Sequence, residues 1–320
     1  MDSDQLDELD RRLVHAFQLD GRVPFSRLAQ VLDVSDQTVA RRYHRLRSTG
    51  VVRVVGVPEV TVLRRVQWLL RVRCMPEAAG AIATALARRD DTTWVSLTSG
   101  GTEIACYTSA PRQEADSGLL LGQLPRTPRV VSVTAHRLLR RFAGGPSGWP
   151  GRASALSPEQ VAALTPSPAA VPLRSEPGDE GLFAALAHDG RAALSTLAAA
   201  SGRSETTVRR RLDHLRASGA LYFDVEVDAV RLGASLSALL WLSVTPARLD
   251  AVAREVATYA EVALVAATTG PTNLVISVGL RDDDALYTFL ATRLGSLPGV
   301  QHIETAPMIR TIKRSGSWQS

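Results

Sequence analysis

The hydrophobic positions of the first fifty residues recur at the spacing of helices. The first stripe comprises Leu6, Leu9, Leu13 and Phe17. This spacing predicts an amphipathic helix, and a second, short helix is predicted at residues 25–32 and a third at residues 35–48. Ser35 stands at the N-cap position of the third helix, and Gly50 follows its last turn as a stop signal. A three-helix module therefore opens the chain.

After Gly50 the pattern changes to the short β-rich runs of residues 51–57 and 67–74. The C-terminal third shows the fullest version, in the order strand, helix, strand, strand, helix, strand. Its segments are residues 238–244, 248–260, 262–270, 273–280, 283–297 and 300–312. This βαββαβ order is typical of a ferredoxin-like antiparallel sheet with both helices on one face. The other face is apolar and requires cover, which a second copy of the sheet would supply.

The chain is an internal duplication. At a constant offset of 169, DGR (20–22) aligns with DGR (189–191), and SDQTVARRYHRLRSTG (35–50) aligns with SETTVRRRLDHLRASG (204–219). After one added residue the alignment continues with VSLTSGGTEIACYT (95–108) over VAATTGPTNLVISV (265–278). Each half therefore contains both modules.

The predicted fold class is α+β, with two winged helix-turn-helix domains and two ferredoxin-like domains whose sheets pack face to face. The predicted domains are 1–60 and 179–230 (helix-turn-helix), 61–142 and 231–320 (ferredoxin-like), and a linker, 143–178. The linker is rich in Pro, Gly, Ser and Ala, and only residues 157–164 within it have helical character. Its length is expected to leave the halves without one imposed orientation.

Composition narrows the function classes only slightly. The net charge of +5 and pI near 9.7 suit a polyanionic partner, but also many other soluble proteins. Two cysteines are too few for a disulfide scaffold or a zinc site, which favours a reducing cytoplasm. The acidic start does not resemble a signal peptide, and the apolar run 232–244 is shorter than a membrane helix. We therefore expect a cytoplasmic protein with no membrane contact.

The arginine-rich segment from Ser204 to Gly219 has one buried side, at about 100° per residue. That side comprises Val208, Leu212 and Leu215. The opposite side comprises Thr206, Thr207, Arg210 and His214, with Arg209 and Arg211 on the flanks. In the first copy the buried set is Val39, Tyr43 and Leu46, and the outward set is Gln37, Thr38, Arg41 and Arg45. The three consecutive arginines therefore do not form one patch.

Outward arginine and glutamine match guanine and adenine edges in the major groove, whereas flanking arginines reach phosphates. Exposure to solvent alone would explain one such arginine-rich segment. This chain has two, and each follows a short helix and a turn and precedes a wing-like β-pair. The repetition favours binding to double-stranded DNA. The predicted DNA-binding residues are Ser35, Gln37, Thr38, Arg41, Arg42, Arg45, Ser204, Thr206, Thr207, Arg209, Arg210, Arg211 and His214. Because the two outward sets differ, we expect asymmetric half-sites.

The pattern LDELDRRLVHAFQLDGRVPFSRLAQVLDVSDQTVARRYHRLRSTGVVR resembles the DNA-binding domain of the Lrp/AsnC (feast/famine) regulators. ATTGPTNLVISV and LGSLPGVQHIETAPMIRTIKR resemble their regulatory RAM domain. The resemblance implies paired sheets, a homo-oligomer or a pseudo-dimer within the chain, and an amino acid or similar metabolite as effector. The effector positions it implies are Thr98, Gly100, Glu103, Thr268, Thr269, Gly270, Asn273 and Thr305.

The chain departs from that family at the effector loop. The family's aspartate, three residues after the loop glycine, is replaced by Glu103 and by Asn273, and Ala135 stands at the counterpart of Thr305. An amide lacks the charge that would hold an ammonium group. Turn formation alone would also explain Gly100 and Gly270.

Two alternatives remain. Tandem proteins of this architecture include the sirohaem decarboxylases, but neither 91–101 nor 260–270 contains the histidines expected there, and the six histidines form no shared cluster. No familiar catalytic motif is present, so we expect no catalytic residue, cofactor or metal. An adaptor that has lost both ligands is the other alternative, and the retained Arg41 and Arg210 argue against it.

Overall fold

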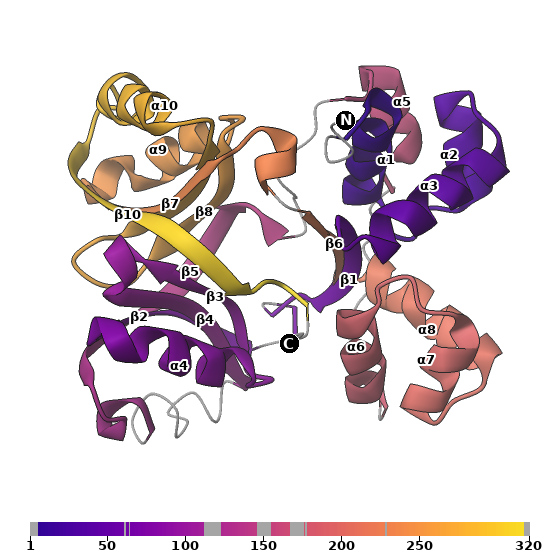
Figure 1. Cartoon of the computed structure of the whole chain (residues 1–320), viewed down its shortest axis with the longest axis horizontal. Helices are drawn as coiled ribbons and strands as arrows, with labels where there is room; N and C mark the ends of the chain where they lie inside the picture. Colours follow the sequence, from indigo (N-terminus) through magenta and orange to yellow (C-terminus); the bar gives the residue numbers. More distant parts are fainter. Residues whose placement is uncertain are drawn as a thin grey trace. The chain divides into compact units, whose positions relative to one another are not determined.

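A computed structural model of the chain describes residues 6–60, 62–63, 65–111, 123–145, 155–166, 176, 178–227 and 229–316. The chain divides into two compact units (Figure 1). The helical unit combines Met1–Leu63 with Arg152–Leu232, and the barrel unit combines Arg64–Gly151 with Gly233–Ser320. Each unit thus takes one module from each copy of the repeat.

The helical unit contains seven helices and two strands among its described residues. They are α1 (Glu8–Leu19), α2 (Phe25–Leu32), α3 (Asp36–Ser48), β1 (Val52–Pro58), α5 (Pro158–Leu164), α6 (Asp179–His188), α7 (Leu194–Ser201), α8 (Glu205–Ala217) and β6 (Leu221–Val227). As predicted, Ser35 caps α3 by accepting from the Thr38 backbone N–H, and Ser204 caps α8 through Thr207. Gly50 follows α3 with φ 68°, a conformation that glycine adopts at little cost.

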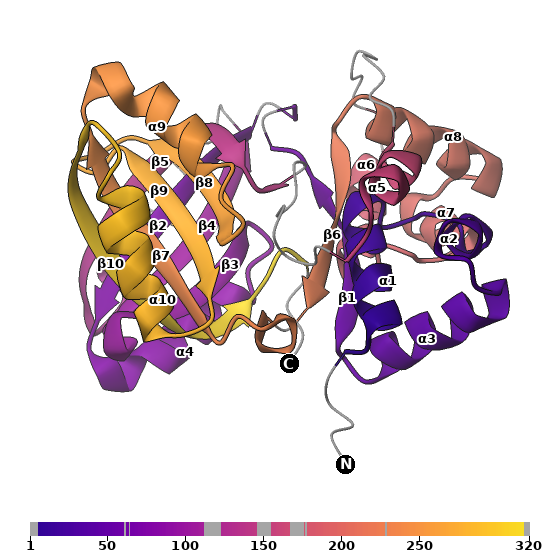
Figure 2. The same ribbon diagram turned by 90° about the horizontal axis from the view of Figure 1, so that it is seen from above.

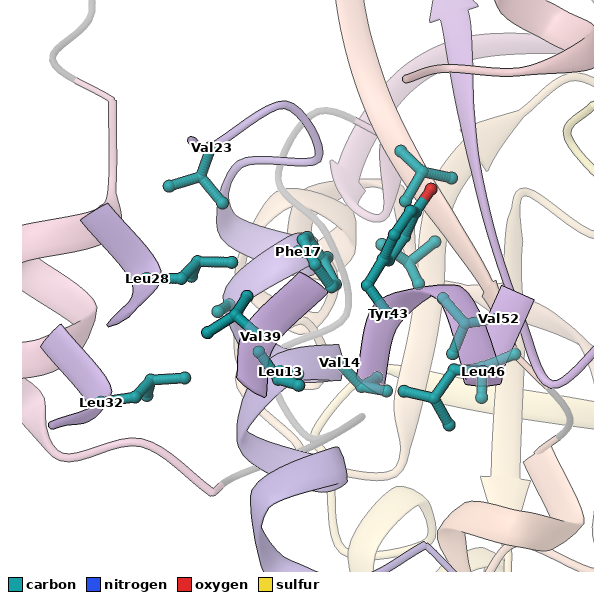
Figure 3. Close-up of a cluster of buried hydrophobic side chains, with 14 of the residues drawn as sticks. Leu13, Val14, Phe17, Val23, Leu28, Leu32, Val39, Tyr43, Leu46 and Val52 are labelled. Atoms are coloured by element: carbon teal, nitrogen blue, oxygen red, sulfur yellow. The ribbon is translucent and has the colours of Figure 1, made fainter. Parts of the chain in front are cut away.

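The first helical core confirms the predicted stripe. Leu13 and Phe17 of α1 point toward Leu28 of α2 and toward Val39 and Tyr43 of α3 (Figure 3). All five side chains are buried, and each such burial contributes about 1.5–3 kcal/mol relative to exposure. The helix α5, within the predicted linker, packs on α1 and α2, and its Leu164 joins this core.

The strands that follow α3 and α8 correct the predicted wings. Instead of forming a β-pair in each copy, β1 and β6 pair antiparallel with each other, from Val52 opposite Val227 to Pro58 opposite Leu221 (Figure 1). Each of these two strands therefore supplies the pairing partner that the other lacks. The expectation that the linker leaves the halves without one orientation is also wrong, because this ladder fixes the two helix-turn-helix modules to one another.

The barrel unit confirms the ferredoxin-like pattern. Its elements are β2 (Arg65–Cys74), α4 (Pro76–Ala87), β3 (Thr92–Thr98), β4 (Glu103–Pro111), β5 (Val130–Ala143), β7 (Leu236–Val244), α9 (Leu249–Val256), β8 (Val262–Thr268), β9 (Leu274–Leu280), α10 (Asp283–Thr288) and β10 (Val300–Lys313). The apolar run near 232–244 is thus the strand β7. Among the described residues, no helix is long and apolar enough to cross a membrane.

The two sheets pack face to face and also join at their edges. The strands form a closed barrel in the order β10-β3-β4-β2-β5-β8-β9-β7, because β5 pairs with both β2 and β8, and β10 pairs with both β7 and β3. The inner faces share a core that includes Leu69, Tyr107, Leu239 and Trp241. The helices α4, α9 and α10 lie outside the barrel (Figure 2). Closure leaves the barrel with no unpaired edge strand.

Candidate functional site

The outer face of α3 carries the polar side chains predicted for it. Gln37, Arg41 and Arg45 are exposed, whereas Val39 and Leu46 are buried in the helical core. On α8, Thr206, Arg209 and Arg210 are exposed, and Val208, Leu212 and Leu215 are buried. The predicted buried sides are therefore confirmed, together with the exposure of these outward residues.

Arg211 is the main correction to the predicted site. Arg211 is only 3% exposed. Its guanidinium donates hydrogen bonds through Nε to the Asp179 carboxylate (2.9 Å) and through Nη1 to the Glu176 carboxylate (3.0 Å). Burial alone would raise the pKa of Asp179, but the hydrogen bonds from Arg211 and from the Glu176 backbone N–H lower it overall. Arg211 therefore ties α8 to α6 and does not reach a phosphate.

The first copy repeats this contact. Arg42 binds Asp7 and also Asp10, whose side chain is 2% exposed. Arg45 also reaches Asp10, yet its own side chain remains 55% exposed. Arg42 is thus mainly structural, and Arg45 keeps access to a ligand. Sequence reasoning missed this contact although it had a signal, because an acidic pair recurs at the offset of 169, as Asp7 and Asp10 and as Glu176 and Asp179.

Three more predicted positions serve the helix itself. The Thr38 and Thr207 hydroxyls lie 2.9 Å from those of the capping residues Ser35 and Ser204 and complete the caps. His214 is half-buried, and its Nε2 is buried without a hydrogen-bond partner in the described part of the chain. The exposed reading set on α8 is therefore reduced to Thr206, Arg209 and Arg210.

The two modules hold one another through reciprocal arginines. Arg22 donates to the carbonyl oxygen of Gly190 (2.8 Å), and Arg191 donates to that of Gly21 (2.7 Å). Arg191 also lies over the ring of Phe25, 4.6 Å from its centroid. The same exchange occurs between Asp20 and Arg216 (2.8 Å) and between Asp189 and Arg47 (2.7 Å). The hydrogen bonds and ion pairs each have a counterpart 169 residues along, as in an isologous dimer interface.

The predicted effector loop of the second copy is filled by the chain itself. The His136 ring lies so close to Gly270 that a Cβ there would be 2.7 Å from Nδ1, and Nδ1 lies 2.9 Å from the Thr269 carbonyl oxygen. The Asn273 amide is bonded to the Val244 backbone in both directions. The Thr268 hydroxyl donates to the carbonyl oxygen of Thr272. These groups are therefore not available to a ligand.

The loop of the first copy is different. A Cβ on Gly100 would meet no atom within 4 Å, because Ala306 stands at the repeat position of His136. Glu103 is buried, however, and receives hydrogen bonds from Arg71 (3.1 and 3.0 Å). Burial disfavours the charge on Arg71, but hydrogen bonds to Glu304 and Glu103 outweigh it and raise the pKa. The carboxylate predicted to hold an ammonium group already holds a guanidinium.

The remaining predicted effector residues lie within the strands. Thr98 donates from its buried hydroxyl to the Glu103 carbonyl oxygen (3.3 Å). Thr305 is half-buried on β10, where it pairs with Leu240 of β7. Neither residue adds an open contact to its loop.

Comparison with known proteins gives the same two modules. A model of the AsnC-type helix-turn-helix domain matches residues 6–47, and a model of the Lrp/AsnC ligand binding domain matches residues 237–318. The HTH-type transcriptional regulator FL11 of Pyrococcus horikoshii is 30% identical over 138 residues, which span 43% of this chain and 91% of FL11. The chain belongs to the Lrp/AsnC family.

This Lrp/AsnC chain is about twice the length of such relatives. The FL11 regulator of Pyrococcus furiosus, 27% identical, also matches 43% of the chain. The siroheme decarboxylase NirDL has a similar fold over 98% of this chain and 95% of its own, with a TM-score of 0.64 and 13% identity. The family thus accounts for both modules. NirDL shows that the fold of the whole chain, with its two copies, also occurs in another protein.

Proposed function

We propose that the chain is a sequence-specific DNA-binding transcriptional regulator of Lrp/AsnC type that carries both of its reading helices in one polypeptide. The observation that supports this most is the pair Arg41 and Arg210. They occupy the same repeat position on α3 and α8, both are exposed, and neither makes an ion pair within the described residues. An unpaired, outward guanidinium on a recognition helix suits bidentate contact with guanine.

Selection of bound sequences from random DNA, followed by mobility-shift titration, tests this function. Arg41→Ala and Arg210→Ala should each weaken binding to a selected site by about 1–3 kcal/mol. The control is Arg281→Ala, which removes one positive charge from the barrel unit, where the side chain is 80% exposed. Failure to enrich any sequence, or equal affinities for the three variants, would contradict the proposal.

We propose regulation and not catalysis. The similarity to NirDL concerns the fold, whereas FL11 and the other relatives found by sequence are named as regulators. We infer that such a regulator acts on DNA in the cytoplasm. Adding a tetrapyrrole to the purified chain and recording its visible absorption spectrum tests the enzyme alternative. A stoichiometric spectral shift would favour the decarboxylase.

For effector control we propose the first loop, around Gly100, as the responsive site. The second loop is filled by His136, and Gly100 has open space where Gly270 does not. Because Glu103 is already bound to Arg71, we expect the effector of the first loop to lack the ammonium group of a plain amino acid. A thermal-shift series with amino acids and their deaminated 2-oxo analogues tests this, and stabilisation by amino acids alone would contradict it.

A further inference from the structure

We propose that the chain binds a non-palindromic operator in a single orientation. One half-site contains a guanine read by Arg41 and an adjacent adenine read by Gln37, and the other contains the guanine read by Arg210 without that adenine. This inference rests on the proposed function. The inference goes beyond the proposed function because it states which duplexes are bound and in which orientation the chain lies on them.

The framework that presents the two reading helices is symmetric. Two buried positions and the capping position are identical in the two copies, namely Val39 and Val208, Leu46 and Leu215, and Ser35 and Ser204. The structural ion pairs of Arg42 and Arg211 are likewise repeated. The β1–β6 ladder and the reciprocal arginines then fix the two modules about a local two-fold axis.

The exposed faces do not share that symmetry. Seven of the thirteen positions differ between α3 and α8. In the order first copy then second copy, four of the seven lie on the outward or flanking sides: Gln37 and Thr206, Ala40 and Arg209, His44 and Asp213, and Arg45 and His214. Both members are exposed at the first and third of these positions. These four differences therefore lie where a ligand would lie, while Arg41 and Arg210 are shared.

The chemistry of the differing side chains gives each half-site its own preference. Glutamine offers a donor and an acceptor that pair together with adenine, whereas the shorter threonine hydroxyl makes one undirected contact. Gln37 and Thr206 lie in the first turn of their helices, the part of a recognition helix that reaches base edges. The Asp213 carboxylate can accept a hydrogen bond from the amino group of cytosine. His44, at the equivalent position of α3, has no carboxylate to offer. A duplex with two identical half-sites would satisfy only one of these faces.

A homodimer with exact two-fold symmetry binds a palindrome equally in either direction. This chain has lost that equivalence on its reading faces and retained it in its framework. Its complex with DNA therefore has a direction.

Sequence selection with the full chain tests the operator. We expect guanine at equivalent positions in both half-sites and adenine in only one of them. Gln37→Thr should abolish the adenine preference, on the order of tenfold in affinity, without changing the guanines. The reciprocal double variant Gln37→Thr with Thr206→Gln should move the adenine preference to the other half-site.

Directed cleavage tests the orientation. An iron chelate attached to Ser48→Cys, an exposed position at the end of α3, should cut the wild-type operator beside one half-site, since both native cysteines are buried. In the reciprocal double variant the cuts should shift toward the other half-site. A palindromic selected site, or equal cuts on both sides, would overturn this inference and leave the proposed function intact. No enriched sequence at all would instead refute the proposed function.

Discussion

Val55 lies opposite Asp224 in the ladder of β1 and β6, and the two residues occupy the same position of the repeat. Their numbers differ by 169 (224 minus 55), which is the offset of the two copies. A residue that faces its own counterpart marks a local two-fold axis. The helical unit is thus built like a family dimer within one chain, and the contacts around this axis are the first to test.

Gly190 is the position at which side-chain bulk should damage that interface. A Cβ there would lie 2.9 Å from the Val55 carbonyl carbon and 3.0 Å from that of Val54, and backbone cannot move aside as a flexible side chain can. We expect Gly190→Ala to destabilise the helical unit by about 1–3 kcal/mol, the usual cost of overpacking. Calorimetric unfolding measures the change.

Gly80→Ala is the matched control for that substitution. Gly80 lies inside α4, and its Cβ would meet only the end of Arg310, at 3.9 Å. Replacing a helical glycine by alanine should stabilise the barrel unit by about 0.5–1 kcal/mol. Equal and small effects of the two substitutions would mean that Gly190 does not lie in a tight contact.

Arg211→Ala should lower stability rather than affinity for DNA. It removes the guanidinium that neutralises the buried Asp179, and breaking a buried pair in this way costs about 3–5 kcal/mol. Urea unfolding measures the loss. The neighbouring Arg209→Ala removes the same charge from an exposed position and should leave the unfolding free energy within about 0.5 kcal/mol. A folded, stable Arg211→Ala that has only a lower salt dependence of DNA binding would restore the phosphate role.

The sequence predicted the modules well and the contacts between side chains less well. Periodicity sets which face of α3 and α8 is buried, since Val39 and Val208 lie at helical spacing within their own segments. It carries no information on what a flanking residue meets, so it predicts a phosphate contact for Arg211, whereas Asp179, on another helix, binds that side chain. The wing was misread for the same reason, because the partner of β1 is 169 residues away in the repeat.

The effector loops show a further limit. The sequence located Gly270 and Asn273 by resemblance, but the group that fills the second loop is His136, from the other copy. Nothing in the alignment of the copies links position 136 to position 270. Only the pairing of β5 with β8, which joins the two sheets, brings these residues together.

Acid should weaken the attachment of the segment before α5. His15 accepts hydrogen bonds at Nδ1 from the backbone N–H groups of Ala155 (3.3 Å) and Leu156 (3.2 Å), and burial lowers the pKa of His15. A lowered folded-state pKa means that protonation favours the unfolded state. Neutral His15 therefore contributes its full share to the free energy of unfolding above pH 6.5, the ordinary pKa of histidine. This share is lost as the pH falls below 6.5 toward the lower pKa of His15 in the folded state.

The measurement for His15 is the thermal midpoint of the helical unit between pH 7.5 and 5.5. We expect it to fall more in the wild type than in His15→Asn, whose side chain can accept a hydrogen bond without titrating in this range. His188→Asn, at the end of α6, is the matched substitution that leaves His15 in place. Parallel curves for the wild type and His15→Asn would exclude His15 as the titrating group.

The contact between His136 and Gly270 can be isolated by a double-mutant cycle. Gly270 has φ 110°, so Gly270→Ala carries backbone strain in any background, and in the wild type its Cβ would also meet the His136 ring. His136→Ala removes the ring and places alanine at this position, as Ala306 does at the equivalent position of the second copy. The strain is common to both backgrounds and cancels in the cycle, so the remaining coupling reports the clash alone.

We expect Gly270→Ala to be less destabilising in the His136→Ala background by about 1 kcal/mol or more, measured by urea unfolding of the four proteins. Additive effects would show that the second loop is not closed by His136, and the assignment of the first loop as the responsive site would lose its support.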